Sequence, residues 1–409
     1  MNDRWRFCNY GGPLERSQRD DVIARIDAWW QQFQGNTQAL NALFSQEAEW
    51  DLPEWMATHL QAIHPSLMWE YGPAVNTDGH RLVITPESAH HLRPLTDTII
   101  ERAPKIEGWE FYAYRLPEDV ETAEATVEAR TGGDIRDVEV RVTRGDHHFI
   151  DICFCSPRTS GEDDEAALGE SFVAAETLLG EECLDKWIGS IDVSPKSKRG
   201  GLSKLFGRGE AESPRMLSLD RLKDTVDALV GSIRDQLPQQ PHFEWVDQAE
   251  WTIWELTPRE ADDYPEQFDL FVGKSANAPM WTSAHGNGLF YSERFTRCGE
   301  TFCYVKMDGT EGLDEEEFAD KADIEDALDE VLKTDGLGCQ IGGGTGVRYS
   351  YIDLALVDLQ RGIEAVRNRL QQGNVPKRSW IQFYDSDLAT EWVGVYDDSP
   401  PPPMPPLDE

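Results

Sequence analysis

Apolar side chains recur at steps of three and four residues in several stretches of this chain, which is the spacing of one face of an α-helix. The first stripe consists of Val22, Ile26, Trp29, Trp30 and Phe33. Trp29 and Trp30 could serve as a stacking platform for a ligand, but aromatic residues at helical spacing more often belong to a core. The same spacing predicts helices at residues 18–48 (one or two helices), 54–63, 89–103, 118–130, 163–183, 218–233, 314–334 and 358–372.

Other stretches alternate between apolar and polar positions, or are short and apolar throughout, and these predict β-strands. They lie at residues 67–71, 81–85, 109–115, 135–144, 147–155, 187–193, 242–256, 267–272, 288–296, 301–307, 337–341, 347–357 and 380–384. Helices and strands mixed in this way predict an α+β fold.

One sequence pattern, which predicts a strand, a helix and a second strand, occurs twice in the chain. The first copy runs from HHFIDICFCSP (residues 147–157) to DKWIGSIDV (185–193), and the second from YSYIDLALVDL (349–359) to RSWIQFYD (378–385). In both copies an Ile-Asp pair, with Asp151 or Asp353, opens an apolar strand, and a Trp-Ile pair, with Trp187 or Trp380, opens the strand after the helix. The repetition predicts an internal duplication, and chance similarity is the alternative.

From Thr301 onward the predicted order is strand, helix, strand, strand, helix, strand, and the first half reads in the same order from Trp109. This is the order of a ferredoxin-like βαββαβ element. A chain of 409 residues also fits two domains better than one. We therefore expect an α+β fold with two domains, each containing a ferredoxin-like element. The expected segments are an N-terminal domain at residues 1–195, a basic flexible linker at 196–215, a C-terminal domain at 216–398 and a proline-rich, unpacked tail at 399–409.

The formal net charge of −38 limits the possible partners. Such a field repels nucleic acid and anionic membrane surfaces and favours cationic partners. A solvated surface without a dedicated partner is the usual reason for such a charge, and an acidic surface that docks on a basic protein is the sharper alternative. The basic linker at residues 196–215 suggests nucleic-acid binding, but its positive charges more plausibly contact the acidic faces of the same protein.

The sequence predicts a cytoplasmic protein. The N-terminal segment MNDRWRFCNYGG lacks the apolar core of a secretion signal, and no run approaches the length of a membrane span. The seven cysteines are an odd number without a framework spacing, which suits a reducing compartment.

The predicted strand at residues 147–155 carries the first candidate site. Alternation places His147, Asp151, Cys153 and Cys155 on one face, where they offer donor atoms of the kind that bind metals. A structural zinc site generally needs a second cysteine pair, and the other closely spaced cysteines lie in the other half of the chain. We therefore expect no metal and no cofactor, and we interpret the two cysteines as small buried groups.

Two further segments contain candidate residues. His285 lies in the turn-rich segment TSAHGNG and could titrate near neutrality, but the sequence shows no partner for it. The GGGTG run at residues 342–346 resembles a phosphate loop, yet a strand follows it where such a loop needs a helix, and Arg348 is the nearest cation. We interpret this run as a hairpin turn. Asp151, Asp353 and Arg348 are the polar residues to inspect first.

Two blocks of the chain resemble uncharacterised bacterial proteins. The segments DAWWQQF, HPSLMWEYGP, RLVITPE and APKIEGWEFYAYR resemble the N-terminal part of bacterial domains of unknown function. The block from IGGGTGVRYSYIDLALVDLQRGIEAVRNRL to VPKRSWIQFYDSDLATEWVGVYDD resembles another recurring domain of this kind. The resemblance implies kinship without an activity, so it implies no catalytic residue. A similarity to acidic, ferredoxin-like ribonuclease regulators concerns fold and charge alone.

Together these observations predict an acidic, non-enzymatic binding or regulatory protein that acts through contacts with another protein. The sequence lacks a Gly-x-Ser-x-Gly nucleophile elbow, a His-Glu-x-x-His motif and a dinucleotide fingerprint. The alternative is a hydrolase or metal-dependent enzyme with a site between the two domains. Its candidate catalytic residues are His147, Asp151 and His285.

Overall fold

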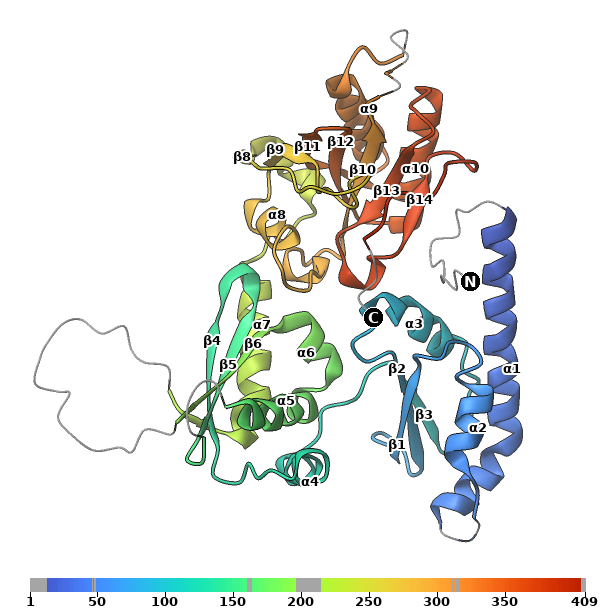
Figure 1. Cartoon of the computed structure of the whole chain (residues 1–409), viewed down its shortest axis with the longest axis vertical. Helices are drawn as coiled ribbons and strands as arrows, with labels where there is room; N and C mark the ends of the chain where they lie inside the picture. The colour runs from blue at the N-terminus through green and yellow to red at the C-terminus, as the bar shows by residue number, and fades with distance from the viewer. Residues whose placement is uncertain are drawn as a thin grey trace, which may run out of the picture. The chain divides into compact units, whose positions relative to one another are not determined.

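The computed structural model describes residues 13–45, 47, 49–159, 164–195, 215–310, 312–313 and 317–405, and these form an α+β protein with several sheets (Figure 1). The chain divides into two compact units. The first contains residues 1–113, 239–285 and 290–409, and the second contains residues 114–238 and 286–289. The predicted linker at 196–215 lies outside the described residues except for Arg215, and the predicted domain boundaries stay a prediction.

The N-terminal part of the first unit packs helices on a three-stranded sheet. Its elements are α1 (Pro13–Phe44), α2 (Leu52–His59), β1 (Met68–Pro73), β2 (His80–Thr85), η1 (His90–Leu92), α3 (Arg93–Glu101) and β3 (Trp109–Tyr112). Trp29, Trp30 and Phe33 of α1 are buried in one cluster with Trp55 and Trp109. The prediction that this apolar stripe belongs to the core is therefore confirmed. The alternative, a stacking platform for a ligand, is wrong.

The rest of the first unit is built on a seven-stranded sheet in which every neighbouring pair is antiparallel. The strand order is β14 (Trp392–Gly394), β13 (Ser379–Phe383), β10 (Thr301–Asp308), β12 (Tyr349–Leu356), β11 (Gly338–Gly346), β9 (Leu270–Ser275) and β8 (Thr252–Glu255). Its helices are α8 (Ala278–Ala284), α9 (Lys321–Thr334) and α10 (Leu359–Gln372), with short 3-10 turns η5 (His242–Glu244), η6 (Val246–Gln248), η7 (Ser292–Arg294) and η8 (Ser386–Leu388).

The two faces of this sheet differ in character because successive side chains of a strand point to opposite sides. Val305 and Ile352 share a core with Ile324 of α9 and Val366 of α10, and this face is called the helix face below. The opposite face carries the alternating set Tyr304, Lys306, Asp308, Tyr349, Tyr351 and Asp353, and is called the polar face.

The second unit has a four-stranded sheet with its own core. Its strand order is β6 (Ile188–Pro195), β5 (Ile150–Ser156), β4 (Glu139–Arg144) and β7 (Leu217–Ser218). The helical elements are α4 (Val120–Thr131), η2 (Asp146–His148), α5 (Glu165–Leu179), α6 (Glu181–Trp187), η4 (Leu219–Arg221) and α7 (Leu222–Gln236). Ile150, Ile152 and Phe154 point into the core, as the alternation of this strand predicts.

The strand order of the N-terminal half differs from the predicted one. β3, its expected first strand, pairs with β2 in another sheet, and β5 and β6 lie side by side in parallel. In the second copy of the repeated pattern β10 lies between β12 and β13. Residue periodicity reports which face of a strand is buried, but not which strand becomes its neighbour.

Two local predictions are wrong. The GGGTG run is not a turn but the end of β11, and the hairpin turn is formed by Val347 and Arg348. Glycine is required there because a Cβ at Gly342 would lie 2.6 Å from Oδ2 of Asp353. The tail is also packed in its described part, since Pro402 is buried. None of the helices in the described ranges is long and apolar enough to cross a membrane.

Candidate functional site

β8 is an edge strand of the seven-stranded sheet and presents backbone groups to the outside. The amide of Leu256 donates to the carbonyl of Phe271 over 2.9 Å, which continues the β8–β9 ladder. Antiparallel ladders use every second residue, so the N–H and C=O groups of Ile253 and Glu255 point away from β9. Within the described part of the chain, no strand pairs with this outer side.

The same edge exposes large apolar side chains. Ile253 is 70% exposed, Trp251 42% and Phe271 41%. Single exposed apolar residues are common on protein surfaces, but a set beside an unpaired strand edge is typical of a binding surface. Lys274 of β9 lies over the Trp251 ring, with its Nζ 5.6 Å from the ring centroid.

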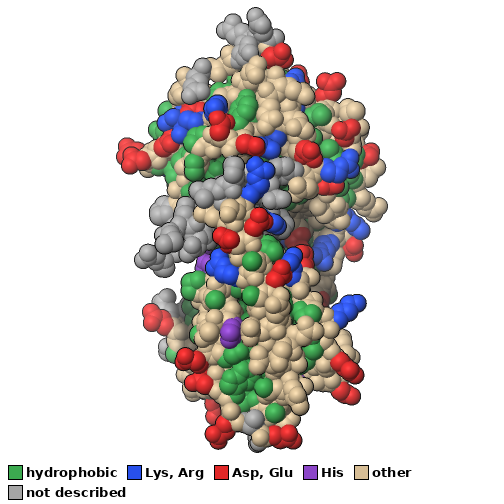
Figure 2. All heavy atoms as spheres, turned by 90° about the vertical axis from the view of Figure 1, so that its right-hand side faces the viewer, with side chains coloured by type: hydrophobic (Ala, Val, Ile, Leu, Met, Phe, Trp, Pro, Cys, Tyr) green, Lys and Arg blue, Asp and Glu red, His purple; other side chains and the backbone are tan. Residues whose placement is uncertain are grey.

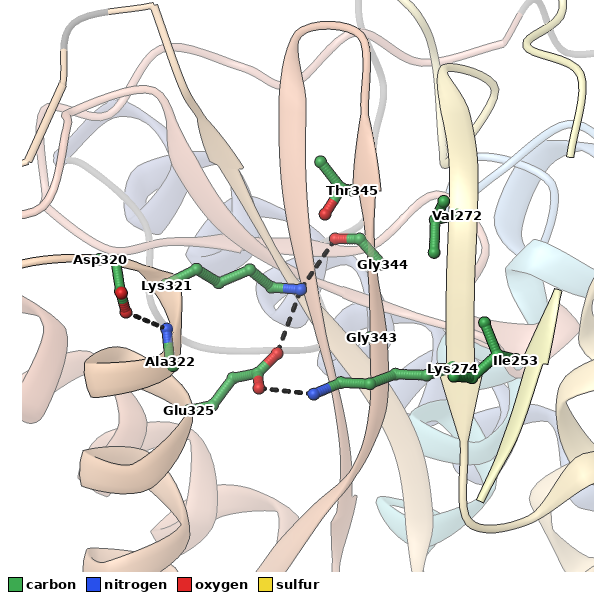
Figure 3. Close-up of a pocket in the computed structure, with 10 residues that line it drawn as sticks. All are labelled: Ile253, Val272, Lys274, Asp320, Lys321, Ala322, Glu325, Gly343, Gly344 and Thr345. Carbon is green, nitrogen blue, oxygen red and sulfur yellow. Dashed lines mark hydrogen bonds and ion pairs between the residues drawn. The ribbon is translucent and has the colours of Figure 1, made fainter. Parts of the chain in front are cut away.

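A pocket of about 390 Å³ opens on the helix face beside this edge (Figure 3). Ile253 of β8, Lys274 of β9 and Gly344 of β11 form its strand side, and Lys321 and Glu325 of α9 form its helix side. Its remaining lining residues are Val272, Asp320, Ala322, Gly343 and Thr345. The glycines leave room because no side chain rises from β11 at these positions.

The charged groups of the pocket bind one another. Glu325 is 8% exposed, and its carboxylate accepts from Nζ of Lys274 over 2.7 Å and lies 3.1 Å from Nζ of Lys321. Lys321 also donates to the carbonyl of Gly344 over 2.9 Å, and Asp320 caps α9 by accepting from the Ala322 amide. Because two lysines face two carboxylates, the lining carries no net charge. The arrangement suits a side chain with an apolar body better than a free anion.

Two sequence-predicted residues, Asp353 and His285, are joined by a buried hydrogen-bond chain on the polar face. The Tyr384 hydroxyl donates to Oδ1 of Asp353 over 2.9 Å and accepts from Nε2 of Gln267 over 3.0 Å. Oε1 of Gln267 lies 2.7 Å from Nε2 of His285, whose Nδ1 lies 2.8 Å from the carbonyl oxygen of Trp281. Burial raises the pKa of Asp353 to about 7 and lowers that of His285 to about 4, because both charged forms lose water.

Arg348 belongs to an ion-pair ring instead of forming an open anion site. Its guanidinium lies 2.7 Å from carboxylate oxygens of both Asp308 and Asp263, and Arg378 contacts the same two carboxylates at 2.9 and 2.7 Å. Burial alone would raise the pKa of Asp308, but hydrogen bonds from Arg348, Thr310 and Arg378 outweigh it and lower the pKa to about 2. Two positive and two negative charges balance within this ring.

The connection from β8 to β9, residues 256–269, covers part of the polar face and is called the covering loop below. Lys306 is fully buried beneath it and donates to the backbone carbonyls of Tyr264 and Glu266 over 2.5 and 2.7 Å. Burial lowers the pKa of Lys306 to about 7. Asp263, Tyr264 and Glu266 have positive φ angles of 53°, 44° and 47°, which side chains other than glycine rarely adopt.

His147 and Asp151 belong to the second unit, whereas His285 belongs to the first. His147 lies in the turn before β5 with a φ of 52°. Asp151 and Cys153 lie half-buried on the outer face of β5, where Nη2 of Arg141 lies 3.3 Å from Sγ of Cys153. Within the described ranges, no group of three or more His, Cys, Asp or Glu residues could hold a metal ion.

Sequence reasoning missed a buried histidine–carboxylate pair. Nδ1 of His242 lies 3.0 Å from Oε2 of Glu300, and Thr296 donates to the same oxygen over 2.6 Å. Nδ2 of Asn277 lies 3.0 Å from Nε2 of His242. His242, Asn277 and Glu300 are far apart in the chain and have no shared motif, so no local signal could have joined them. The Ile253 edge was missed because the alternation in the predicted strand at residues 242–256 does not report its place in the sheet. The structure also shortens this strand to β8 and forms η5 and η6 before it.

Comparison of the chain with protein-family models, curated proteins and solved structures finds no match in any of the three. The resemblance to bacterial domains of unknown function therefore gains no support.

Proposed function

We propose that this chain is a non-enzymatic, cytoplasmic binding or regulatory protein that takes up an extended segment of a partner protein along the outer side of β8. One observation carries the proposal, namely the outward backbone groups of Ile253 and Glu255 beside exposed apolar side chains. An added strand would satisfy these groups by main-chain hydrogen bonds, and its side chains would give specificity.

The pocket supports the same proposal. Neighbouring strands lie about 4.8 Å apart, so a bound segment's side chains on the helix face would cover Ile253 and extend toward the pocket. Lys274 and Glu325, which line it, are already paired with each other. This ion pair fixes the walls of the pocket, and since its charges neutralise each other, the pocket does not require a charged ligand.

Charge favours a basic partner segment. Glu250 and Glu255 are exposed at this edge, and the whole chain has a net charge of −38. On the face drawn in Figure 2, acidic side chains are scattered among basic and apolar ones. The net negative charge of the chain would bring a cationic segment close, and the β8 edge would select its position.

The proposal includes two finer points. We propose that β13, β10, β12 and β11, with α9 and α10, form a ferredoxin-like element, on the support of their order in the sheet. The cysteines of the described ranges are not in disulfide bonds, which supports a reducing compartment. An internal duplication is not part of the proposal, because the two copies of the repeated pattern differ in strand order.

Two variants with the same chemical change test the proposal. Ile253→Lys places a charge on the proposed edge, and Val347→Lys places one on an exposed apolar residue in the β11–β12 turn, which is 60% exposed. The probe is the capped peptide Val-Lys-Val-Lys-Val-Lys, and binding is measured by fluorescence anisotropy and by amide hydrogen exchange. We expect Ile253→Lys to weaken binding about tenfold or more, and Val347→Lys to change it by less than about twofold.

Hydrogen exchange provides the second readout. The bound peptide should slow exchange of the Ile253 and Glu255 amides, because these are the groups that gain partners. Equal binding by the two variants, or saturation by the peptide without protection of these amides, would show that β8 is not the binding edge.

A further inference from the structure

The described end of the tail lies against the part of the polar face formed by β13 and β14. Nε1 of Trp380 donates to the carbonyl of Pro400 over 2.5 Å, and Pro402 is buried. Met404 packs with the aromatic cluster that contains Trp380 and Trp392. Residues 400–403 are four consecutive prolines, a composition that favours the extended polyproline II helix.

The surface beneath the tail has three features of a built site. Trp380 and Trp392 supply aromatic walls and are 0% and 5% exposed. Gly394, which pairs with Trp380, allows the chain to come close, since a Cβ there would lie 2.7 Å from Cβ of Ser399. Gln382, two residues after Trp380 and directly opposite Trp392 in the sheet, places an amide on the same face.

We propose that Trp380, Gln382 and Trp392 form a recognition site for proline-rich segments, and that residues 400–405 of the same chain occupy it as a displaceable resident ligand. Grooves that bind polyproline helices combine aromatic walls with donors to the ligand's backbone carbonyls, since proline itself has no N–H to offer. The indole N–H of Trp380 is such a donor. This site is separate from the β8 edge, because β14 and β8 lie at opposite ends of the sheet.

Gln382 gives a physical reason why another segment can displace the tail. Its Nε2 lies 3.5 Å from Sδ of Met404, while its buried Oε1 has no hydrogen-bond partner among the residues that the structure describes. A thioether gives an amide little hydrogen bonding, and an unpaired buried oxygen is unfavourable. A proline-rich segment with lysine or arginine at the position of Met404 would donate to this oxygen. The preferred ligand is therefore a proline-rich segment with a cationic side chain, which also matches the acidic charge of the chain.

The test uses a chain truncated after Ser399 and two fluorescent peptides. One peptide is SPPPPMPPLDE, the sequence of residues 399–409, and the other carries Met404→Lys. We expect the truncated chain to bind both, with the lysine peptide about tenfold tighter, and the intact chain to bind both at least about tenfold more weakly because its own tail competes. Gln382→Leu in the truncated chain should remove the preference for lysine but keep binding of the first peptide.

The outcomes distinguish specific recognition of proline-rich segments from non-specific binding. A folded truncated chain that binds neither peptide overturns the proposal, as does equal binding of a control peptide with all prolines replaced by alanine. If truncation prevents folding, the full-length variant with Pro400→Gly and Pro402→Gly replaces it, because it loosens the tail without shortening the chain. If that variant also fails to fold, the tail is an integral part of the core and the proposal is wrong.

Discussion

Asp353 is a carboxylic acid buried on the polar face, where the loss of water raises its pKa and favours the neutral form below about pH 7. Its side chain is buried, and its Oδ1 accepts from Tyr384, which in turn is joined to Gln267 and His285. A buried ionised carboxylate without a cationic partner is very unfavourable, so a raised pKa lets the residue stay protonated. The chain from Asp353 to His285 is therefore best understood as a neutral network that fixes side chains on the polar face.

This interpretation predicts how stability depends on pH. With a folded-state pKa of about 7 against an ordinary value of 3.8, Asp353 keeps a proton between pH 4 and 7 that the unfolded chain releases. The stabilisation that comes from this bound proton is fully present below pH 4. As the pH rises from 4 to 7, its loss decreases the free energy of unfolding by up to about 1.4 kcal/mol per pH unit. Asp353→Asn lacks this titration. Urea denaturation at pH 5, 6, 7 and 8 should show the variant gaining stability relative to the wild type up to pH 7.

The exposed Glu255 provides the control for this experiment. Glu255→Gln removes a carboxylate without touching the buried network, so its pH dependence should follow that of the wild type. Parallel curves for Asp353→Asn and the wild type would mean that Asp353 is ionised in the folded protein, and the neutral network would have to be abandoned.

At the scale of single residues, the sequence indicated which polar residues matter for the structure better than it indicated what each of them does. Asp353 and Arg348 stand out as polar groups in apolar strands, and both are central to networks on the polar face. Their partners could not be predicted, because Gln267 and Tyr384 are 117 residues apart and meet only through the pairing of distant strands. Asp151 and His147 stay candidates without a demonstrated role.

At the scale of elements, the covering loop contains three of the seven non-glycine residues that have positive φ angles in the described part of the chain. Glu266 has a φ of 47°, and its backbone carbonyl accepts a hydrogen bond from Lys306. A left-handed conformation costs an L-residue about 1–2 kcal/mol, whereas glycine adopts it freely. The surrounding contacts therefore hold the loop in a strained conformation, as is common beside binding surfaces.

Replacement of Glu266 by glycine should relieve this strain. We expect Glu266→Gly to raise the free energy of unfolding by about 0.5–1 kcal/mol, after the greater chain entropy of glycine is subtracted. Glu260→Gly, at an exposed loop position without positive φ, should lower it by about 0.5–1 kcal/mol. Chemical denaturation of both variants measures the difference. A loss of stability in Glu266→Gly equal to that in Glu260→Gly would show that the loop is not strained at this residue.

The elements themselves were largely predictable, because their apolar spacing records burial. The stripe at Trp29 and the helix at residues 358–372 correspond to α1 and α10. The errors have different causes. Gly342 looked like a turn residue, but its missing side chain makes room for Asp353, which is a tertiary contact. The helix α8 was missed because its seven residues are too few to show a helical period.

At the scale of the whole molecule, the chain leaves the first compact unit at Tyr114 and returns to it at Gln239. The second unit is thus almost entirely one continuous insertion. β7 and α7 follow the predicted linker in sequence, yet β7 pairs with β4 and α7 shares the core of β5. A division of the chain at residues 196–215 would therefore remove a strand and a helix from the second unit.

Protein fragments can distinguish this arrangement from the domain boundaries that the sequence predicts. Residues 114–238 should fold alone with a cooperative thermal transition, because they contain all the strands of their sheet and nearly all of their core. Residues 1–195 should lack such a transition for the β4–β6 region, where α7 no longer covers Val140 and Ile152. Circular dichroism and hydrogen exchange report both. If residues 1–195 and 216–398 fold cooperatively while residues 114–238 do not, the sequence-based division is the correct one. The core around α7 would then be secondary to the contacts within each half.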